Sequence, residues 1–496
     1  MLKSAFVNRI FQLGVISLSV LTSACGTSSA SPTDMPTSGE TTGTVITPPP
    51  SAANAPPSAA AVIPSPAGLV GEKTIADNFD DPSGIEPTRY GAGGSGGIPG
   101  ASADDVGAFR MFCGAGQVLK DDPLVYPGKA GASHLHQFVG NLGTDANSTY
   151  SSLRTSGGTT CGQSATPFNR SAYWIPAMLD GTGNVVKPDF LNLYYKRLPA
   201  SAPGCTDPIK RRGICIDLPN GVRYVFGYNM TTMSGGPADL TSFDQWFISF
   251  ECWGSEDGKI GSGAATARYH TIKEVADAGC PVGAQLVILG FAEDCWDGVN
   301  LDTPDHRSHM VYATGEDKGY GRQCDAGHPY LIPDMQFQWH FTTDANFAKG
   351  LWRLSSDDMM AAMGKPVVPG STMHMDYWEA WSPTVKKTWT DNCINGHLSC
   401  ASGDLGNGTD INGAGIPSGG FPKHVLIAVP ESANPVPAEP DPAPTPTTNP
   451  APAPTPDPAP DPTTQTCPNG TVIPISQTCR TAKTGVAKGA AKKAAH

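Results

Sequence analysis

The sequence lacks the short motifs that mark several common enzyme classes. It contains no P-loop and no His-Glu-x-x-His, and it has no Gly-x-Ser-x-Gly elbow or dinucleotide-binding glycine pattern placed between a strand and a helix. These absences argue against an NTPase, a common metalloprotease, a serine esterase and a nicotinamide-dependent enzyme. Any catalytic function must therefore come from other residues.

The chain also has no Cys-x-x-Cys pair, which argues against a zinc ribbon and a thioredoxin-like redox site. It has thirteen cysteines, of which Cys25 lies at the end of the N-terminal apolar segment. The remaining twelve form an even set, as expected for a fully paired protein in an oxidising compartment. The close pairs that we expect to form local loops are Cys205/Cys215, Cys393/Cys400 and Cys467/Cys479.

The chain has fewer positively charged than negatively charged residues. The chain has 33 Lys and Arg against 45 Asp and Glu, a formal net charge of −12. We therefore expect no nucleic-acid partner for the main domain. The exception is the segment after Cys479, whose lysines and Arg480 could contact an anionic wall polymer or lipid headgroups, or could form a solvated end.

The N-terminus has the pattern of a secretory signal. Lys3 and Arg9 precede the apolar run 10–22, and Leu-Thr-Ser-Ala-Cys25 resembles a lipobox. The run is too short to span a bilayer. We therefore predict a bacterial lipoprotein, with residues 1–24 removed and Cys25 acylated, so that the lipid attaches the protein to a membrane of the cell envelope. Ordinary cleavage, which would release a secreted protein, is the alternative.

Composition divides the rest of the chain into segments. Two stretches rich in proline and small or polar residues are typical of an extended tether and of a semi-rigid spacer. The predicted order is a tether at 25–74, a disulfide-stapled globular domain at 75–430, a proline-rich spacer at 431–465, and a small Cys467/Cys479 loop with the basic tail at 466–496.

Within the globular domain the strongest periodicity is that of strands. In 335–341, large apolar residues alternate with Gln336, Gln338 and His340, which predicts a buried face and a polar face within reach of solvent or a ligand. Helices are predicted only at 355–363, with Ser355 as N-cap, and at 384–391. Further strands are predicted at 191–196, 222–228, 246–252, 285–291 and 424–429. We expect a mainly β fold, an antiparallel β-sandwich or jelly-roll-like body with long loops and few short helices.

Histidines supply the clearest candidate chemistry. His134 and His136 are two residues apart, so a strand would project both imidazoles from one face, about 7 Å apart. With His309 and His374 they form a predicted metal site for zinc or copper, since neutral imidazole is a usual ligand of both ions. A structural or acid–base role for these histidines is the alternative. His306, His328 and His340 are further site candidates.

Carboxylates form a second group of candidate site residues. Asp305 and Asp376 are the predicted catalytic residues, as a base or as groups that orient a ligand. A glycosidase would need two carboxyl groups beside aromatic rings, which Trp296, Tyr377, Trp378 and Trp381 could supply. Turn capping or a structural calcium ion would also explain the Asp-rich loop 295–305.

Several ordered sequence blocks resemble a secreted, disulfide-containing domain family of unknown function found in fungi and bacteria. The blocks run from Phe109-Arg-Met-Phe-Cys113 through Tyr126-Pro-Gly-Lys-Ala-Gly-Ala-Ser-His-Leu-His136 to Trp389-Thr-Asp-Asn-Cys393, and the likeness covers about 109–405. Cys295-Trp-Asp-Gly-Val-Asn-Leu-Asp302, Asp305-His-Arg-Ser-His-Met310 and Met373-His-Met-Asp376 belong to it. The resemblance implies secretion, disulfides and an association with carbohydrate surfaces, and it supplies no catalytic residues.

Two functional hypotheses follow. The first is a surface-anchored enzyme, metal-dependent in its sharper form, that acts on a glycan or another cell-wall polymer. The second is a non-catalytic carbohydrate-binding or adhesion lipoprotein whose exposed tryptophans stack on sugar rings.

Overall fold

A computed structural model of the chain describes residues 69–77, 80–88, 106–229, 247–254, 267–430, 464–467, 472–474 and 476–477. The predicted signal peptide with Cys25, nearly all of the tether and spacer, Cys479 and the basic tail lie outside these residues. Within the described ranges there is no helix whose length and apolar character would let it cross a membrane.

The larger of the two main sheets has six strands. Its neighbours pair antiparallel except β2 and β19, which are parallel. The order across the sheet is β11 (Ile248–Trp253), β12 (Gln285–Phe291), β16 (Asp334–Thr342), β8 (Phe190–Arg197), β2 (Gly107–Cys113) and β19 (Ser399–Cys400).

The second main sheet has five strands, all antiparallel to their neighbours. The order is β10 (Arg223–Gly227), β18 (His374–Trp378), β5 (Ala172–Pro176), β4 (His136–Gly140) and β3 (Val118–Leu119). Strands β18 and β4, far apart in the chain, therefore lie on either side of β5.

The two sheets pack through one aromatic-rich core. Alternate residues of each strand enter it, because successive side chains of a strand point to opposite faces. Phe226 of β10 meets Phe337 of β16 with ring centroids 5.4 Å apart, and the hydroxyls of Tyr173 and Tyr195 lie 2.6 Å apart across the sheets. The mainly β, antiparallel fold with few short helices that the sequence predicts is confirmed.

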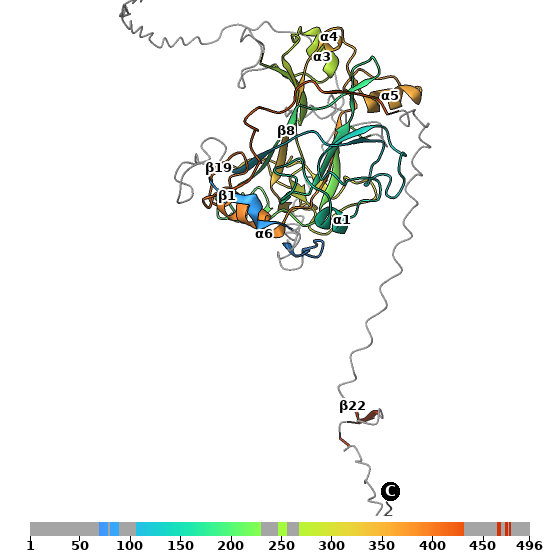
Figure 1. The fold of residues 1–496 in the computed structure, drawn as a ribbon. Helices are drawn as coiled ribbons and strands as arrows, with labels where there is room; N and C mark the ends of the chain where they lie inside the picture. Colours follow the sequence, from blue (N-terminus) through green and yellow to red (C-terminus); the bar gives the residue numbers. More distant parts are fainter. Residues whose placement is uncertain are drawn as a thin grey trace, which may run out of the picture. The chain divides into compact units, whose positions relative to one another are not determined.

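Smaller sheets and short helices complete the body (Figure 1). In this view β8 runs near the centre, and the labelled helices lie around it at the periphery. The additional strands are β1 (Ile85–Pro87) with β20 (Thr409–Ile411); β14 (Met310–Val311), β13 (Cys295–Trp296), β15 (Tyr330–Leu331) and β9 (Ile214–Cys215); and β17 (Arg353–Leu354), β6 (Met178–Leu179), β7 (Asn184–Val186) and β21 (Leu426–Ala428). A separate pair is β22 (Thr464–Thr466) with β23 (Val472–Pro474). The helices are α1 (Tyr150–Thr155), α2 (Pro203–Thr206), α3 (Ile272–Asp277), α4 (Ala345–Ala348), α5 (Ser355–Ala362) and α6 (Pro383–Trp389); a 3-10 turn at Pro82–Gly84 and a π-turn at Thr390–Ile394 are also present.

The predicted strands and helices are confirmed, with small shifts at their boundaries. The predicted 246–252 strand is β11, and residue 246 lies outside the described ranges. Two details of the predictions are wrong. Ser355 is the first residue of α5, and Leu354 is its N-cap. Of the three residues predicted on the polar face of β16, Gln338 and His340 are 8% and 3% exposed and only Gln336 is partly exposed, so neighbouring residues cover most of the face that alternation predicts to be within reach of solvent.

Five disulfide bonds join described cysteines. They are Cys113–Cys161, Cys205–Cys215, Cys252–Cys280, Cys295–Cys324 and Cys393–Cys400. Two of the three predicted local pairs are thereby confirmed. Cys467 is also disulfide-bonded, while its predicted partner Cys479 lies outside the described residues.

Candidate metal centre

The candidate site lies on the face of the five-stranded sheet that points away from the main core. In β18, Met375 and Tyr377 enter that core, so strand alternation turns His374 and Asp376 to the opposite face. His136 of β4 lies on the same face, because Val139, three residues further on, is also in the core. The sheet therefore brings together residues from both ends of the globular domain.

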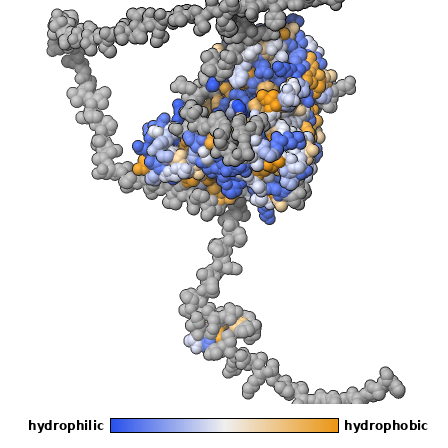
Figure 2. Space-filling model, turned by 60° about the vertical axis from the view of Figure 1, so that its left-hand side comes forward, coloured by the Kyte–Doolittle hydropathy of each residue, from blue (hydrophilic) through white to orange (hydrophobic). Residues whose placement is uncertain are grey.

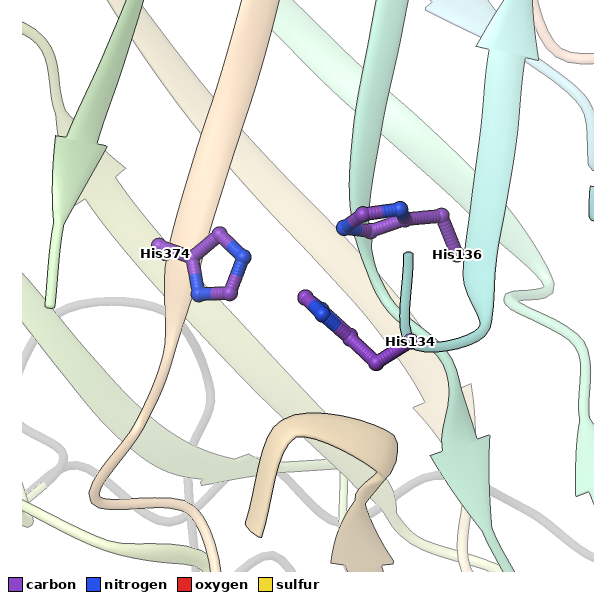
Figure 3. A group of neighbouring side chains, drawn as sticks. All are labelled: His134, His136 and His374. Atoms are coloured by element: carbon purple, nitrogen blue, oxygen red, sulfur yellow. The ribbon is translucent and has the colours of Figure 1, made fainter. Parts of the chain in front are cut away.

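Three histidines converge there. His134, just before β4, joins His136 and His374, and one ring nitrogen from each lies within 4.8 Å of those of the others. The ring centroid of His134 is 4.1 Å from that of His136 and 5.1 Å from that of His374. Figure 3 shows the His134 ring extending between the other two. Of the four predicted metal ligands, the structure groups these three.

Backbone carbonyls fix the orientation of two of the rings. The Nδ1 of His136 donates to the carbonyl of Asp121 at 3.0 Å, and the Nδ1 of His374 donates to the carbonyl of Thr372 at 2.9 Å. A carbonyl only accepts, so in the neutral rings Nδ1 carries the hydrogen and Nε2 keeps its lone pair. The Nε2 atoms of His134 and His136 are buried and have no hydrogen-bond partner among the described residues.

Burial keeps the three rings neutral. Desolvation lowers the pKa of His136 to about 4 and that of His374 to about 3. Desolvation, followed by the neighbouring His136 and His374, lowers the pKa of His134 well below its usual value. Neutral imidazoles with free lone pairs are what a transition-metal ion needs from its ligands.

Two buried carboxyl groups adjoin the histidines. An oxygen of Asp122 and one of Asp376 lie within 4.8 Å of each other and of a ring nitrogen of His136. Asp122 accepts hydrogen bonds from the backbone of Leu124 and Val125, whereas both oxygens of Asp376 are buried without a hydrogen-bond partner among the described residues. Burial, followed by the charge of Asp122, raises the pKa of Asp376 well above its usual value.

Arg307 supplies the nearby positive charge. Its guanidinium donates to the carbonyls of Gly227 at 3.0 Å and Tyr228 at 2.7 Å. Its charge acts against the rise in the pKa of Asp376. The sequence motifs do not single out Asp122 or Arg307 as site residues. Asp122 opens the block that leads to His134, and Arg307 stands between His306 and His309, so their sequence neighbours are the available signal.

The structure places His309 and Asp305 outside this cluster. Both ring nitrogens of His309 have partners, Thr303 Oγ1 at 2.9 Å and the carbonyl of Arg223 at 3.0 Å. One oxygen of Asp305 accepts from the backbone of Arg307 and Ser308 and from the hydroxyls of Thr303 and Ser308. These bonds outweigh desolvation and lower its pKa to about 2. Asp305 stabilises its own loop, His309 ties that loop to β10, and neither belongs to the histidine cluster.

The other histidine candidates also differ in position. His306 pairs with Asp302 at 2.8 Å. Its pKa is raised, because attraction to Asp302, Asp122 and Asp305 outweighs desolvation. His306 is therefore near Asp122 of the cluster but is not part of it. His328 is held by Asp325 and the carbonyl of Ser308. His340 stacks on Phe190 with centroids 4.1 Å apart, on the six-stranded sheet.

The aromatic rings expected beside a sugar are in the interior. Trp296, Tyr377 and Trp381 are fully buried, and Trp378 is 6% exposed. These four rings are therefore not placed to stack on a sugar at the surface. The loop carboxylates are likewise engaged: Asp297 accepts from the backbone of Val299 and Asn300, as turn capping predicts.

A cavity of about 300 Å³ adjoins the histidine cluster, and His134 lines it. Its other walls come from Lys120, the loop around His134, β6, β7 and the turn between them, β17, α5 and Val429. His134 thus belongs both to the buried cluster and to the cavity wall. On the face drawn in Figure 2, hydrophilic residues predominate and hydrophobic ones form small separate groups.

Fold and site together define a disulfide-bonded, mainly β protein with a histidine–carboxylate cluster on one sheet. More than half of the chain, residues 122–381, matches the family described as "Domain of unknown function (DUF1996)", and the chain belongs to that family. All five clustered residues, from Asp122 to Asp376, lie inside the matched range. No curated protein and no solved structure matches the chain.

Proposed function

We propose that this protein is an exported, metal-dependent enzyme that acts on a glycan or another cell-wall polymer, with its metal ion bound by His134, His136 and His374. The observation that carries the proposal is the convergence of three neutral imidazoles, one ring nitrogen of each lying within 4.8 Å of those of the others. The buried Nε2 atoms of His134 and His136 have no partner among the described residues. Leaving such nitrogens without a partner is costly, and a bound ion removes that cost.

Zinc is the ion that the donor set favours. Three imidazole ligands leave a coordination position open, as in catalytic zinc sites, where the ion lowers the pKa of bound water to near neutrality. The carbonyls of Asp121 and Thr372 accept the far ring hydrogens of His136 and His374, as backbone groups behind zinc-binding histidines do. Copper, the other ion expected from the sequence, also binds imidazole.

Asp376 is the proton-handling group in this proposal. Its carboxyl is adjacent to His136 and Asp122 and carries no competing hydrogen bond among the described residues. A carboxyl whose pKa is raised by burial accepts and releases protons nearer neutral pH. Arg307 limits that rise and holds its guanidinium near the developing negative charge.

Export rests on independent features. The signal-like N-terminus, with Cys25 as the acylated residue, attaches the protein to a membrane of the cell envelope. The paired cysteines suit an oxidising compartment. His134 lines the neighbouring cavity, and there the polymer would approach the centre.

Metal analysis of the full chain, expressed in a periplasm and dialysed against zinc or copper, tests the metal centre. We expect one zinc ion per chain in the native protein and near-zero zinc in the His134→Ala/His136→Ala variant. His328→Ala is the matched control, because its ring lies in another loop, and it should keep the ion. Equal zinc in the native protein and the double variant would overturn the proposal.

Incubation with purified wall glycans tests the activity. Release of product by the zinc-loaded native protein, and not by the double variant, supports an enzyme. Binding without product release would replace it with the carbohydrate-binding or adhesion alternative.

A further inference from the structure

The cavity beside His134 has an aliphatic interior. Among the described residues that line it, Leu135, Leu179, Met359 and Val429 contribute apolar side chains, and none is Phe, Tyr or Trp. Sugar rings are commonly recognised by stacking on the faces of such aromatic side chains. This lining instead suits a flexible aliphatic group.

Several polar groups on the cavity wall are engaged with protein partners. Arg353 forms a two-bonded ion pair with Asp358 at 2.5 and 2.9 Å. The hydroxyl of Ser355 donates to the carbonyl of Leu135 and accepts from the backbone of Ala177. The amide of Asn184 is likewise bonded to Asp180. Lys120 also lines the cavity, and the remaining contact surface is largely aliphatic.

His134 connects this aliphatic cavity to the proposed metal ion. A group occupying the cavity would therefore have one end beside the ion and its tail against Leu135, Leu179, Met359 and Val429. A carbonyl joined to a short alkyl chain meets both requirements, because its oxygen is a ligand for zinc and its chain is apolar.

We infer that the cavity binds the acyl group of an ester or amide, so that the substrate is an acylated polymer and the reaction removes its acyl group. This inference rests on the proposed metal-dependent function and names its substrate class. Water forms a new bond from its oxygen to the acyl carbon. The bond from that carbon to the alcohol oxygen or amine nitrogen breaks, and the leaving group takes a proton.

A series of alkyl hydroxamates tests the inference without requiring the natural substrate. Hydroxamates bind zinc through two oxygens and carry an acyl chain of chosen length. We expect calorimetry with the zinc-loaded full chain to show affinity rising about fourfold per added methylene from acetohydroxamate to butyrohydroxamate.

Three substitutions locate the effect. Met359→Phe fills the cavity from α5, and Val429→Phe fills it from the residues after β21. Each should abolish the rise in hydroxamate affinity with chain length, while acetohydroxamate still binds. Ala361→Phe is the control, because Ala361 is exposed on the same helix and does not line the cavity. Near-ultraviolet circular dichroism checks the folding of each variant.

The outcomes separate the two proposals. A zinc-loaded native protein whose hydroxamate affinity is independent of chain length overturns the acyl inference and leaves the metal centre intact. The acyl inference also fails if both phenylalanine variants fold and their hydroxamate affinity still rises with chain length. A protein that binds neither zinc nor copper overturns the proposed function, and the acyl inference with it.

Discussion

Two backbone carbonyls decide what the central histidines present to the site. By accepting the Nδ1 hydrogens of His136 and His374, the carbonyls of Asp121 and Thr372 leave Nε2 of each neutral ring as the nitrogen with the lone pair. Sequence spacing could not reveal this, because backbone acceptors have no side-chain signature. At the residue scale the site is therefore defined by hydrogen bonds as much as by the residue types.

Asp376 should separate metal binding from proton transfer. Asp376→Asn keeps the shape of the side chain and removes its acid–base function, so turnover of the polymer should fall about 10²- to 10⁴-fold while zinc content stays unchanged. Parallel measurements of turnover and zinc content check this. Loss of zinc in Asp376→Asn would make Asp376 a ligand, and unchanged turnover would remove it from the mechanism.

Glu293 should make the free energy of unfolding fall as pH rises from about 4.5 to about 8. Burial outweighs the attraction of Arg307 and raises the pKa of Glu293 to about 8. Between its unfolded value near 4.5 and about 8 the folded state binds more protons, so the unfolding free energy falls as pH rises through this window, by at most about 1.4 kcal/mol per pH unit.

Urea denaturation from pH 5 to pH 9 measures that dependence. Glu293→Gln cannot ionise, so its stability should decline less steeply than that of the native protein. Glu316→Gln, an exposed position, is the matched control. Identical slopes for Glu293→Gln and the native protein would contradict the expectation.

The spacing of His134 and His136 correctly predicts that their rings lie close together, but the structural reason differs from the predicted one. The spacing of His134 and His136 predicts one strand face, yet β4 begins at His136 and His134 lies in the preceding loop. Loop curvature brings their rings to 4.1 Å, closer than strand spacing would. Spacing does not reveal Asp122, because its proximity to Asp376 depends on the pairing of β4, β5 and β18, which is a long-range property.

At the scale of elements, local patterns are most informative where one face is buried. Strong alternation in 335–341 predicts β16 because Phe337 and Trp339 enter the core. The same reasoning fails for the opposite face, since the burial of His340 depends on Phe190 and Trp253 from other strands. Periodicity thus identifies an element and its inner face, and tertiary packing decides what covers the outer face.

The segment before β1 is attached to α1 by buried charges, which sequence patterns do not indicate. Arg154 of α1 is fully buried and contacts Asp77 and Asp80, each at 3.3 Å. Arg170 also pairs with Asp80. Since two arginines share one carboxylate, Asp80 is the central residue of this network.

Asp80→Ala should therefore destabilise the protein by about 3 kcal/mol, because it leaves two buried arginines undercompensated. Thermal and urea unfolding of the full chain measure the loss. Asp81→Ala is the neighbouring control, since Asp81 is exposed and its carboxylate accepts from the backbone of Ser83 in its own turn. A loss for Asp80→Ala no larger than the control's would refute the central role of Asp80.

At the scale of the whole molecule, disulfides connect segments that the sheets alone do not join. Cys113, at the end of β2, is bonded to Cys161 across 48 residues, whereas Cys393–Cys400 closes only seven. Because cross-links restrict the unfolded chain, a longer closed loop stabilises the folded state more. An even cysteine count can be read from the residues, but the long-range partners follow only from the folded sheets.

Removing the two bridges in turn should reveal this difference. On loop length alone, Cys113→Ala/Cys161→Ala should cost about 1.7 kcal/mol more unfolding free energy than Cys393→Ala/Cys400→Ala. Urea unfolding of both double variants under oxidising conditions gives the comparison. Zinc content is measured in parallel, because a loss of zinc would show that a variant disturbs the five-stranded sheet. All four cysteines are buried, so an equal or reversed order would show that differences in packing around the two bridges outweigh loop entropy in this fold.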